Sequence, residues 1–240
     1  MDKGKVQDFK FYSNELQEEL EILVYLPPQY TPFSQYSYMI AQDGKDYFML
    51  GRIPRLLDKL ITENEIEPII FFGIPYKDVQ DRRKKYHPNG EKHQQYMNFL
   101  IHEFIPFIEE NYPVSQMGKS RALAGDSLAA TVSLLSAQQY PNMFGKLMLH
   151  SPYVNQDILQ SSLEFNHWDL LTIYHVVGLL ETEVKMTDGA IGDFLTPNRK
   201  LMQIIKENNT EYFYDEFNGN HTWTYWQKDL LRGLKFLFPY

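Results

Sequence analysis

One serine, in residues 122–130, has the sequence context of a catalytic nucleophile. The segment reads Ala-Leu-Ala-Gly-Asp-Ser-Leu-Ala-Ala, so a short apolar strand runs into Gly-x-Ser-x-Ala and a helical pattern follows. Small residues at Gly125 and Ala129 let the strand and the helix approach around a strained turn that exposes the Ser127 hydroxyl. The pattern predicts a nucleophile elbow at Ser127. The alternative is an ordinary turn in which Ser127 only caps the helix.

One histidine stands where the base for such a serine is expected. A serine hydroxyl is a weak nucleophile alone and needs a base that is itself oriented by a carboxylate. Where this elbow occurs in hydrolases, the chain order is serine, acid, histidine. Of the seven histidines, only His221 follows the strand expected to carry the acid, in the turn-rich residues 217–223. His221 is therefore the predicted base, and a surface histidine without a role is the alternative.

The acid is expected in the loop after the apolar run that ends at Gly178. Glu181 lies just beyond this glycine, and Glu183, Asp188 and Asp193 are within reach of the same loop. We favour Glu181 and place Asp188 second. The alternative is that a carboxylate in this loop is only solvated, as most carboxylates are.

Two backbone N–H groups are expected to stabilise the oxyanion that forms when the serine attacks a carbonyl. Leu128 directly follows the serine and supplies one of them. The other is expected from residues 42–47, because Gly44 permits a close approach of the backbone, and the predicted donor is Gly44 or Lys45. The same segment also fits an ordinary turn between a strand and a helix.

Strands and helices alternate along the chain in a way that can position these residues. Residues 20–26 alternate between apolar and polar side chains, which predicts antiparallel strands with one solvated face at the N-terminus. Further strands are predicted at residues 37–41, 68–74, 121–124, 146–150, 173–178 and 211–217. Helices are predicted at residues 52–62, 97–108, 128–139, 197–207 and 223–237, with a bend at Pro106. The alternation predicts an α/β fold with a mostly parallel sheet covered on both sides by helices.

The length and composition indicate one folded domain. The 240 residues are 43% hydrophobic and contain no internal repeat, low-complexity tract or linker, so we expect a single domain over residues 1–240. The 23 basic and 31 acidic side chains give a net charge of −8, which disfavours a nucleic-acid partner. The absence of cysteine excludes disulfides, thiolate catalysis and cysteine-ligated metal sites.

The N-terminus and the apolar runs predict a cytoplasmic protein without a membrane partner. Residues 1–9 are polar and charged, unlike a secretory signal. The longest apolar runs, residues 69–74 and 176–180, are far too short to cross a membrane.

Residues 76–96 are polar and rich in basic side chains, although the protein is acidic overall. One interpretation is a solvated loop. The other is a substrate-facing insertion whose cations attract an anionic substrate, since Arg82 offers bidentate donors. Tyr86 and Trp223 are the further predicted substrate contacts. Trp223 and Trp226 form either an aromatic wall of the site or the core face of the last helix.

Taken together, these motifs resemble the putative-esterase group of α/β-hydrolases, which includes enterochelin esterases, S-formylglutathione hydrolase and feruloyl-esterase-like enzymes. The resemblance covers roughly residues 26–236. The segments that match the family are Asp43-Gly44, residues 81–88, residues 104–109, residues 125–129, Gly178-x-x-Glu181, Asn198-Arg199 and residues 219–223 with Trp226. The departures are Ala129 in place of an elbow glycine, Gln42 in place of histidine, Lys85 in place of glutamate and Asn220 in place of glycine. None of these departures removes a catalytic side chain.

The resemblance implies an α/β-hydrolase three-layer sandwich with antiparallel N-terminal strands. It implies a serine esterase that acts through Ser127, His221 and Glu181 and an acyl-enzyme, with no metal or organic cofactor required. The implied substrate is a small-molecule ester, for example a siderophore trilactone or an aryl ester. An acyltransferase with the same three residues is the alternative, and a non-catalytic binding protein on this scaffold is a third.

Overall fold

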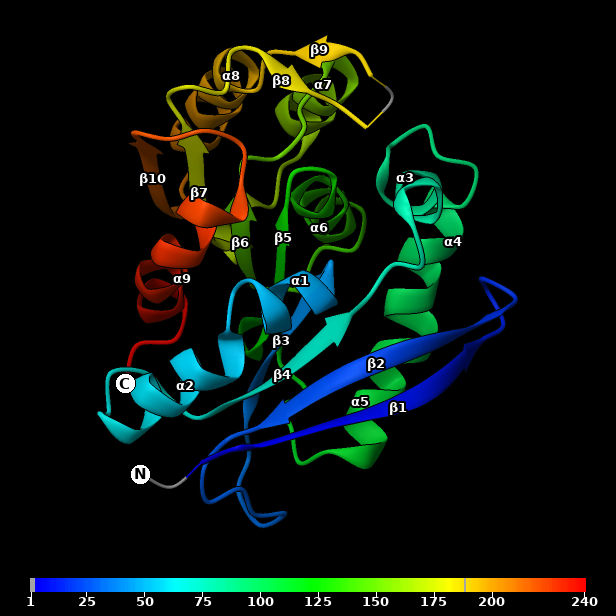
Figure 1. Ribbon diagram of the computed structural model, residues 1–240, viewed down its shortest axis with the longest axis vertical. Helices are drawn as coiled ribbons and strands as arrows, with labels where there is room; N and C mark the ends of the chain where they lie inside the picture. The colour runs from blue at the N-terminus through cyan, green and yellow to red at the C-terminus, as the bar shows by residue number, and fades with distance from the viewer. Residues whose placement is uncertain (1–2, 188) are drawn as a thin grey trace.

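An eight-stranded sheet forms the centre of the protein, which we describe from a computed structural model covering residues 3–187 and 189–240. The strands lie in the order β1-β2-β4-β3-β5-β6-β7-β10 (Figure 1). Their bounds are β1 Lys5–Ser13, β2 Glu18–Leu26, β3 Ser37–Gln42, β4 Ile69–Ile74, β5 Arg121–Asp126, β6 Lys146–His150, β7 Thr172–Gly178 and β10 Glu211–Phe217. The β1–β2 and β2–β4 pairs are antiparallel, and the remaining pairs are parallel. The predicted α/β fold, with antiparallel N-terminal strands, is confirmed.

Helices cover both faces of the sheet and give it three layers. One face packs against α4 (His93–Asn98), the π-helix at Phe99–Phe104, α5 (Ile105–Asn111), α6 (Leu128–Gln139), α7 (Gln156–Glu164) and α8 (Leu195–Lys206). The other face packs against α1 (Gly44–Met49), α2 (Ile53–Thr62) and α9 (Trp223–Leu237). Successive side chains of β3 point to opposite faces of the sheet, so a strand with apolar residues throughout needs helices on both faces. Tyr38 and Ile40 lie in the first hydrophobic core, on the α4–α8 face, and Met39 and Ala41 lie in the second, on the face covered by α1, α2 and α9.

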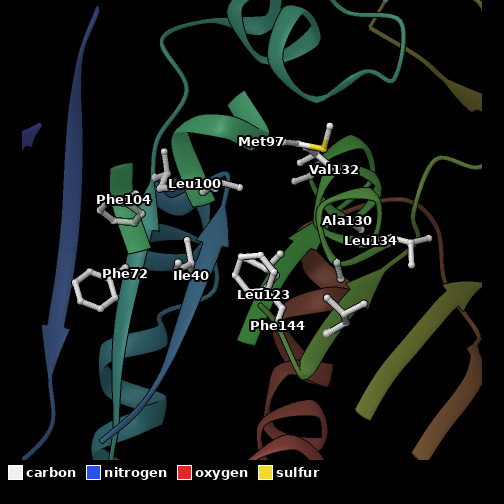
Figure 2. Close-up of a cluster of buried hydrophobic side chains, with 14 of the residues drawn as sticks. Ile40, Phe72, Met97, Leu100, Phe104, Leu123, Ala130, Val132, Leu134 and Phe144 are labelled. Atoms are coloured by element: carbon white, nitrogen blue, oxygen red, sulfur yellow. The ribbon is translucent and has the colours of Figure 1, made fainter. Parts of the chain in front are cut away.

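The first core fills the space between the sheet and its larger set of helices. Figure 2 shows Ile40, Phe72 and Leu123 on neighbouring strands facing side chains such as Leu100 and Val132 on the helices. All five of these residues are fully buried. Strands buried on both faces in this way explain the continuous apolar runs of the central sequence segments.

The helix predicted at residues 97–108 is irregular. It consists of α4, the π-helical turn and α5, and Pro106 lies in the first turn of α5 rather than at a bend in mid-helix. Proline lacks the N–H that an uninterrupted helix would need at this position, and the wider π-helical turn directly precedes it.

Three helices, α1, α3 (Val79–Tyr86) and α7, were not predicted. The polar composition of residues 76–96 favours a loop, but Asp78 caps α3 by accepting a hydrogen bond from the Asp81 N–H at 2.9 Å. The strongly polar sequence of α3 lacks the apolar periodicity that identifies a helix.

A short hairpin, β8 (Val184–Lys185) and β9 (Ile191–Gly192), follows β7 and lies at the end of the molecule that also carries α3 (Figure 1). Within the described part of the chain, no helix has the length and apolar character needed to cross a membrane.

Truncation of a central core side chain tests this packing. Leu123 lies on β5 between Ile40 of β3 and Leu147 of β6 and is fully buried. We expect Leu123→Ala to lower the free energy of unfolding by about 3 kcal/mol, because it leaves a cavity among close-packed strands. Urea unfolding followed by circular dichroism measures the loss.

The matched control is Leu163→Ala on α7, whose side chain is 59% exposed. This variant should change the free energy of unfolding by less than about 0.5 kcal/mol. Equal losses in the two variants would contradict the assignment of Leu123 to the core.

Candidate active site

Ser127 occupies a strained turn between β5 and α6. Its backbone angles are φ 55° and ψ −125°, a region that residues with a side chain rarely occupy. A side chain at Gly125 would place its Cβ 2.2 Å from the backbone of Ala129, so only glycine fits there. The Ser127 N–H donates a hydrogen bond to the carbonyl of His150 at 2.9 Å, and the serine side chain makes no capping bond to α6. The backbone at Ser127 is therefore strained, and the serine hydroxyl does not cap α6.

His221 and Glu181 meet in a direct hydrogen bond. Nδ1 of His221 lies 2.7 Å from Oε2 of Glu181, across a sequence separation of 40 residues. Glu181 is fully buried, and its other oxygen, Oε1, accepts hydrogen bonds from the Ser151 hydroxyl at 2.7 Å and the Gly178 N–H at 2.8 Å. Trp226 Nε1 in turn donates to the Ser151 hydroxyl at 3.1 Å. Both oxygens of the Glu181 carboxylate therefore take part in hydrogen bonds. A carboxylate fixed in this way orients the His221 ring with Nδ1 toward Glu181.

Two of the other carboxylates considered as the acid, Glu183 and Asp193, have other surroundings in the structure. Glu183 is exposed, and Asp193 accepts a hydrogen bond from the Thr196 N–H at 3.0 Å at the start of α8. Asp188, the second choice from the sequence, lies outside the described residues. Glu181 is the carboxylate that the structure brings to His221.

Ser127 and His221 line the same pocket, which has a volume of about 260 Å³. His221 packs against Phe194 and Trp226, with ring centroids 4.4 and 4.9 Å apart. The remaining lining residues come from the loop after β3, the β4–α3 region, the elbow, the β6–α7 loop, the hairpin β8–β9 and the start of α9. These segments follow the carboxyl ends of the parallel strands, where sites in such sheets collect.

Two further buried histidines, His150 and His175, have structural partners. His150 lies 3.1 Å from the Asp229 carboxylate. His175 contacts the Tyr212 hydroxyl at 2.8 Å and the Asn198 side-chain oxygen at 2.7 Å. Burial lowers the pKa of His175 to about 4. Neither of these two histidines lines the pocket.

The predicted oxyanion donors lie in the first turns of two helices, α6 and α1. Leu128 is the first residue of α6 and lines the pocket. Gly44 begins α1 and packs so closely on β4 that an added Cβ would lie 2.3 Å from the Ile74 backbone. The Lys45 side chain is exposed, and the residues of this segment that line the pocket are Asp43 and Asp46.

The basic segment contributes Arg82 to the pocket wall, but two of its cations, Arg82 and Lys85, are buried in ion pairs. Arg82 makes a bidentate pair with Asp43, with Nη2 and Oδ2 2.6 Å apart, and also donates to the backbone oxygen of Asp126 at 3.1 Å. Lys85 is 2% exposed and pairs with Glu18 and Asp81. Burial raises the pKa of Asp43, and the adjacent guanidinium opposes this rise. Arg82 is therefore neutralised by the protein.

Two of the three predicted substrate contacts line the pocket, and the third does not. Arg82 and Trp223 line the pocket, whereas Tyr86 is 1% exposed, lies outside the pocket wall and packs on Tyr96. Trp226 both lines the pocket and belongs to the buried face of α9, so the two interpretations of this tryptophan are compatible.

Several pocket residues were missed by the sequence analysis. Asp126 directly precedes the serine, and its position in the elbow was a usable signal. Tyr153, Phe194 and Met186 reach the pocket from loops and from the hairpin β8–β9, and no local pattern marks them. Among the described residues, no group of three or more histidine or acidic side chains is arranged to hold a metal ion.

The Arg82–Asp43 pair can be tested by its contribution to stability. We expect Arg82→Met to lower the free energy of unfolding by about 3 to 5 kcal/mol, because it leaves Asp43 buried without its partner. The control is Arg199→Met, which removes a 2.7 Å pair with Glu216 from a side chain that is 47% exposed. That loss should stay below about 1 kcal/mol. Similar losses in urea unfolding of the two variants would refute a structural role for the buried pair.

Comparisons with known proteins place the chain in a family. Residues 13–237 match the family model described as Putative esterase. The uncharacterized protein YjcH of Bacillus subtilis (strain 168) is 48% identical over 232 residues, covering 97% of each chain. An acetyl esterase of Caldicellulosiruptor saccharolyticus is 20% identical over 259 residues, with 97% of each chain covered.

Solved structures share the fold at low sequence identity. A ferulic acid esterase superposes with a TM-score of 0.81 at 17% identity, covering 99% of each chain. The enterobactin esterase FES from Shigella flexneri superposes with a TM-score of 0.84 at 16% identity, covering 97% of this chain and 58% of that one. Because the family model spans residues 13–237, the chain belongs to the putative esterase family of α/β-hydrolases and is an ester hydrolase.

Proposed function

We propose that the protein is a serine carboxylic-ester hydrolase in which Ser127 is the nucleophile, His221 the general base and Glu181 the orienting acid. The observation that carries the proposal is the 2.7 Å contact between His221 Nδ1 and the fully buried Glu181 carboxylate, on a pocket that Ser127 also lines. A carboxylate can only accept from Nδ1–H, so this contact leaves Nε2 of the imidazole as the proton acceptor.

The proposed reaction proceeds in two stages. His221 Nε2 takes the proton from the Ser127 hydroxyl as its oxygen bonds to the ester carbonyl carbon. The tetrahedral intermediate collapses when the C–O bond to the alcohol breaks, and His221 returns the proton to the departing alcohol oxygen. Water then attacks the acyl carbon as His221 Nε2 takes its proton. The bond between that carbon and the Ser127 oxygen breaks, His221 returns the proton to this oxygen, and the carboxylic acid leaves. Glu181 stabilises the imidazolium that forms in each stage.

Backbone donors are proposed to stabilise the oxyanion. The Leu128 N–H, in the first turn of α6, is adjacent to the nucleophile. The second donor is proposed to be the N–H of Gly44 or Lys45 in the first turn of α1, where helical N–H groups have no partner within the helix. Such fixed donors act on charge that develops only as the reaction proceeds.

The size and walls of the pocket favour a small acyl or aryl ester. Its volume of about 260 Å³ is slightly below the roughly 300 Å³ at which sites for drug-sized ligands begin. Tyr153, Phe194 and Trp223 provide aromatic wall surface. A flat aryl or short acyl group suits such walls better than a large macrocyclic trilactone.

Removal of the nucleophile tests the proposal directly. Ser127→Ala should lower kcat/KM for p-nitrophenyl acetate by at least about 10³-fold, because no covalent intermediate can form. A fluorophosphonate probe should label the unaltered protein at Ser127, as located by peptide mass mapping, and should not label the variant.

Ser161→Ala, which removes a hydroxyl on α7 outside the pocket, is the control and should retain labelling and turnover. Labelling at another residue, or turnover that survives in Ser127→Ala, would exclude Ser127 as the nucleophile.

The identity of the acid is tested by a matched pair of substitutions. Glu181→Gln removes the charge that holds His221, and we expect kcat to fall by about 10²- to 10⁴-fold. Glu183→Gln changes an exposed carboxylate two positions away and should leave kcat unchanged. A larger loss in Glu183→Gln than in Glu181→Gln would overturn the assignment.

A further inference from the structure

A second serine, Ser151, contacts the proposed triad from outside the pocket. It directly follows β6 and is fully buried, and the pocket wall formed by the described residues does not include it. Its hydroxyl donates a 2.7 Å hydrogen bond to Oε1 of Glu181, while Oε2 of the same carboxylate contacts His221. An effect of Ser151 on the reaction would therefore pass through Glu181 and not through the substrate.

The direction of the hydrogen bonds through Ser151 follows from the groups involved. The indole N–H of Trp226 can only donate, and it donates to the Ser151 oxygen at 3.1 Å. Since the oxygen accepts this bond, the single hydroxyl hydrogen is available for Glu181, whose ionised carboxylate can only accept. The chain of donors therefore runs from Trp226 through Ser151 to Glu181, which also accepts from His221 Nδ1–H.

The segment that carries Ser151 also holds the backbone of the nucleophile. The Ser127 N–H donates to the carbonyl of His150 at 2.9 Å, and the Tyr153 N–H donates to the carbonyl of Ser127 at 3.3 Å. Residues 150–153 thus contact the nucleophile twice and the acid once. They link the loops after β5 and β7 through the segment after β6, the strand that lies between these two in the sheet.

Ser151 occupies this position in a strained backbone conformation. Its φ of 47° lies in the left-handed region, which glycine adopts freely and residues with a side chain rarely adopt. The Ser151 N–H donates to the carbonyl of Val176 at 2.7 Å, so the turn is fixed to β7. Strained conformations of this kind concentrate at functional sites. Here the strained residue carries the hydroxyl that donates to Glu181.

We infer that Ser151 is a positioning residue of the reaction, whose hydroxyl fixes Glu181 relative to His221 and limits how strongly the carboxylate attracts a proton. The inference rests on the proposed function, in which Glu181 orients His221. A hydrogen bond to an ionised carboxylate stabilises the ionised form and weakens its attraction for a proton. Without the Ser151 donor, the pair of Glu181 and His221 should bind a proton more readily, whichever of the two side chains holds it.

Other titratable groups surround the same pair, and a substitution at Ser151 leaves them in place. The carboxyl groups on the pocket wall with His221 are Asp43, Asp46 and Asp126. The cationic or basic side chains there are Arg82, Arg83, His87 and Lys185, and the phenols are Tyr76 and Tyr153. Next to Ser151 in the chain, His150 lies 3.1 Å from the Asp229 carboxylate. A comparison of variants at Ser151 therefore isolates the contribution of its hydroxyl.

The experiment removes the hydroxyl and follows the protonation of His221. In Ser151→Ala, the acidic limb of kcat/KM against pH for p-nitrophenyl acetate should move to higher pH by about 0.5 or more, because the base is protonated at higher pH. The plateau kcat should fall about 10-fold as Glu181 is held less firmly. KM should stay within about two-fold, because Ser151 lies outside the pocket wall.

NMR measures the same protonation without turnover. The ring proton resonances of His221, assigned by comparison with His221→Gln, are followed over pH in the unaltered protein and in each Ser151 variant. Their midpoint should move to higher pH together with the acidic limb of kcat/KM.

Two further variants separate the hydroxyl from the fold. Ser151→Gly also lacks the hydroxyl but adopts a φ of 47° without strain, and it should show the same movement to higher pH. Ser162→Ala removes the hydroxyl of another fully buried serine, which accepts from Gln138 at 3.0 Å on α7, and it should keep the original pH profile. Unchanged profiles in both Ser151 variants, or an equal movement in Ser162→Ala, would overturn the role of Ser151.

The NMR titration distinguishes this inference from the proposed function. Ester turnover that depends on Ser127, with the same His221 midpoint in the unaltered protein and both Ser151 variants, would overturn the inference alone. A moved midpoint in both variants of a protein without Ser127-dependent turnover would overturn the proposed function and retain the coupling of Ser151 to the pair.

Discussion

The hydrogen bond between His221 and Glu181 is the contact on which the geometry of the site depends. It joins the loop after β7 to the loop after β10, two neighbouring parallel strands, at an Nδ1–Oε2 distance of 2.7 Å. The carboxylate is fully buried, yet it is stabilised by donors from Ser151 and Gly178, so its desolvation is compensated by fixed hydrogen bonds. Because Trp226 also holds the Ser151 hydroxyl, the packing of α9 onto the sheet supports the orientation of the imidazole.

The parallel sheet brings the remaining groups to the same edge. Ser127 follows β5, Asp43 follows β3 and Glu181 follows β7, so residues far apart in the chain meet at the carboxyl ends of the strands (Figure 1). The strained backbone of Ser127 is maintained by its N–H bond to His150 and by the close contact of Gly125 with Ala129. The close-packed cores on both faces of the sheet supply the stability that such local strain requires.

A second polar cluster in the pocket wall consists of Asp43, Arg82 and Asp126, in which Arg82 donates to the Asp43 carboxylate and to the backbone oxygen of Asp126. The pairing of Arg82 with Asp43 places one cation of the basic segment in the pocket wall as a buried ion pair. The buried ion pair is therefore expected to contribute to the stability of the pocket wall.

The sequence by itself determined the fold class and the order of the main strands and helices. It also singled out Ser127 and His221 as site candidates and favoured Glu181 over Asp188 as the acid. These follow from local signals: apolar periodicity, an elbow that only small residues permit, and the chain order of a triad. The burial of Arg82 and Lys85, the helix α3 and the contribution of the β8–β9 hairpin to the pocket were decided only by the tertiary structure. From the sequence, the side chains of Arg82 and Lys85 are expected to be solvated, because most charged side chains are. Their burial depends on a partner carboxylate that folding brings beside them, and for Arg82 that partner, Asp43, is 39 residues away in the chain.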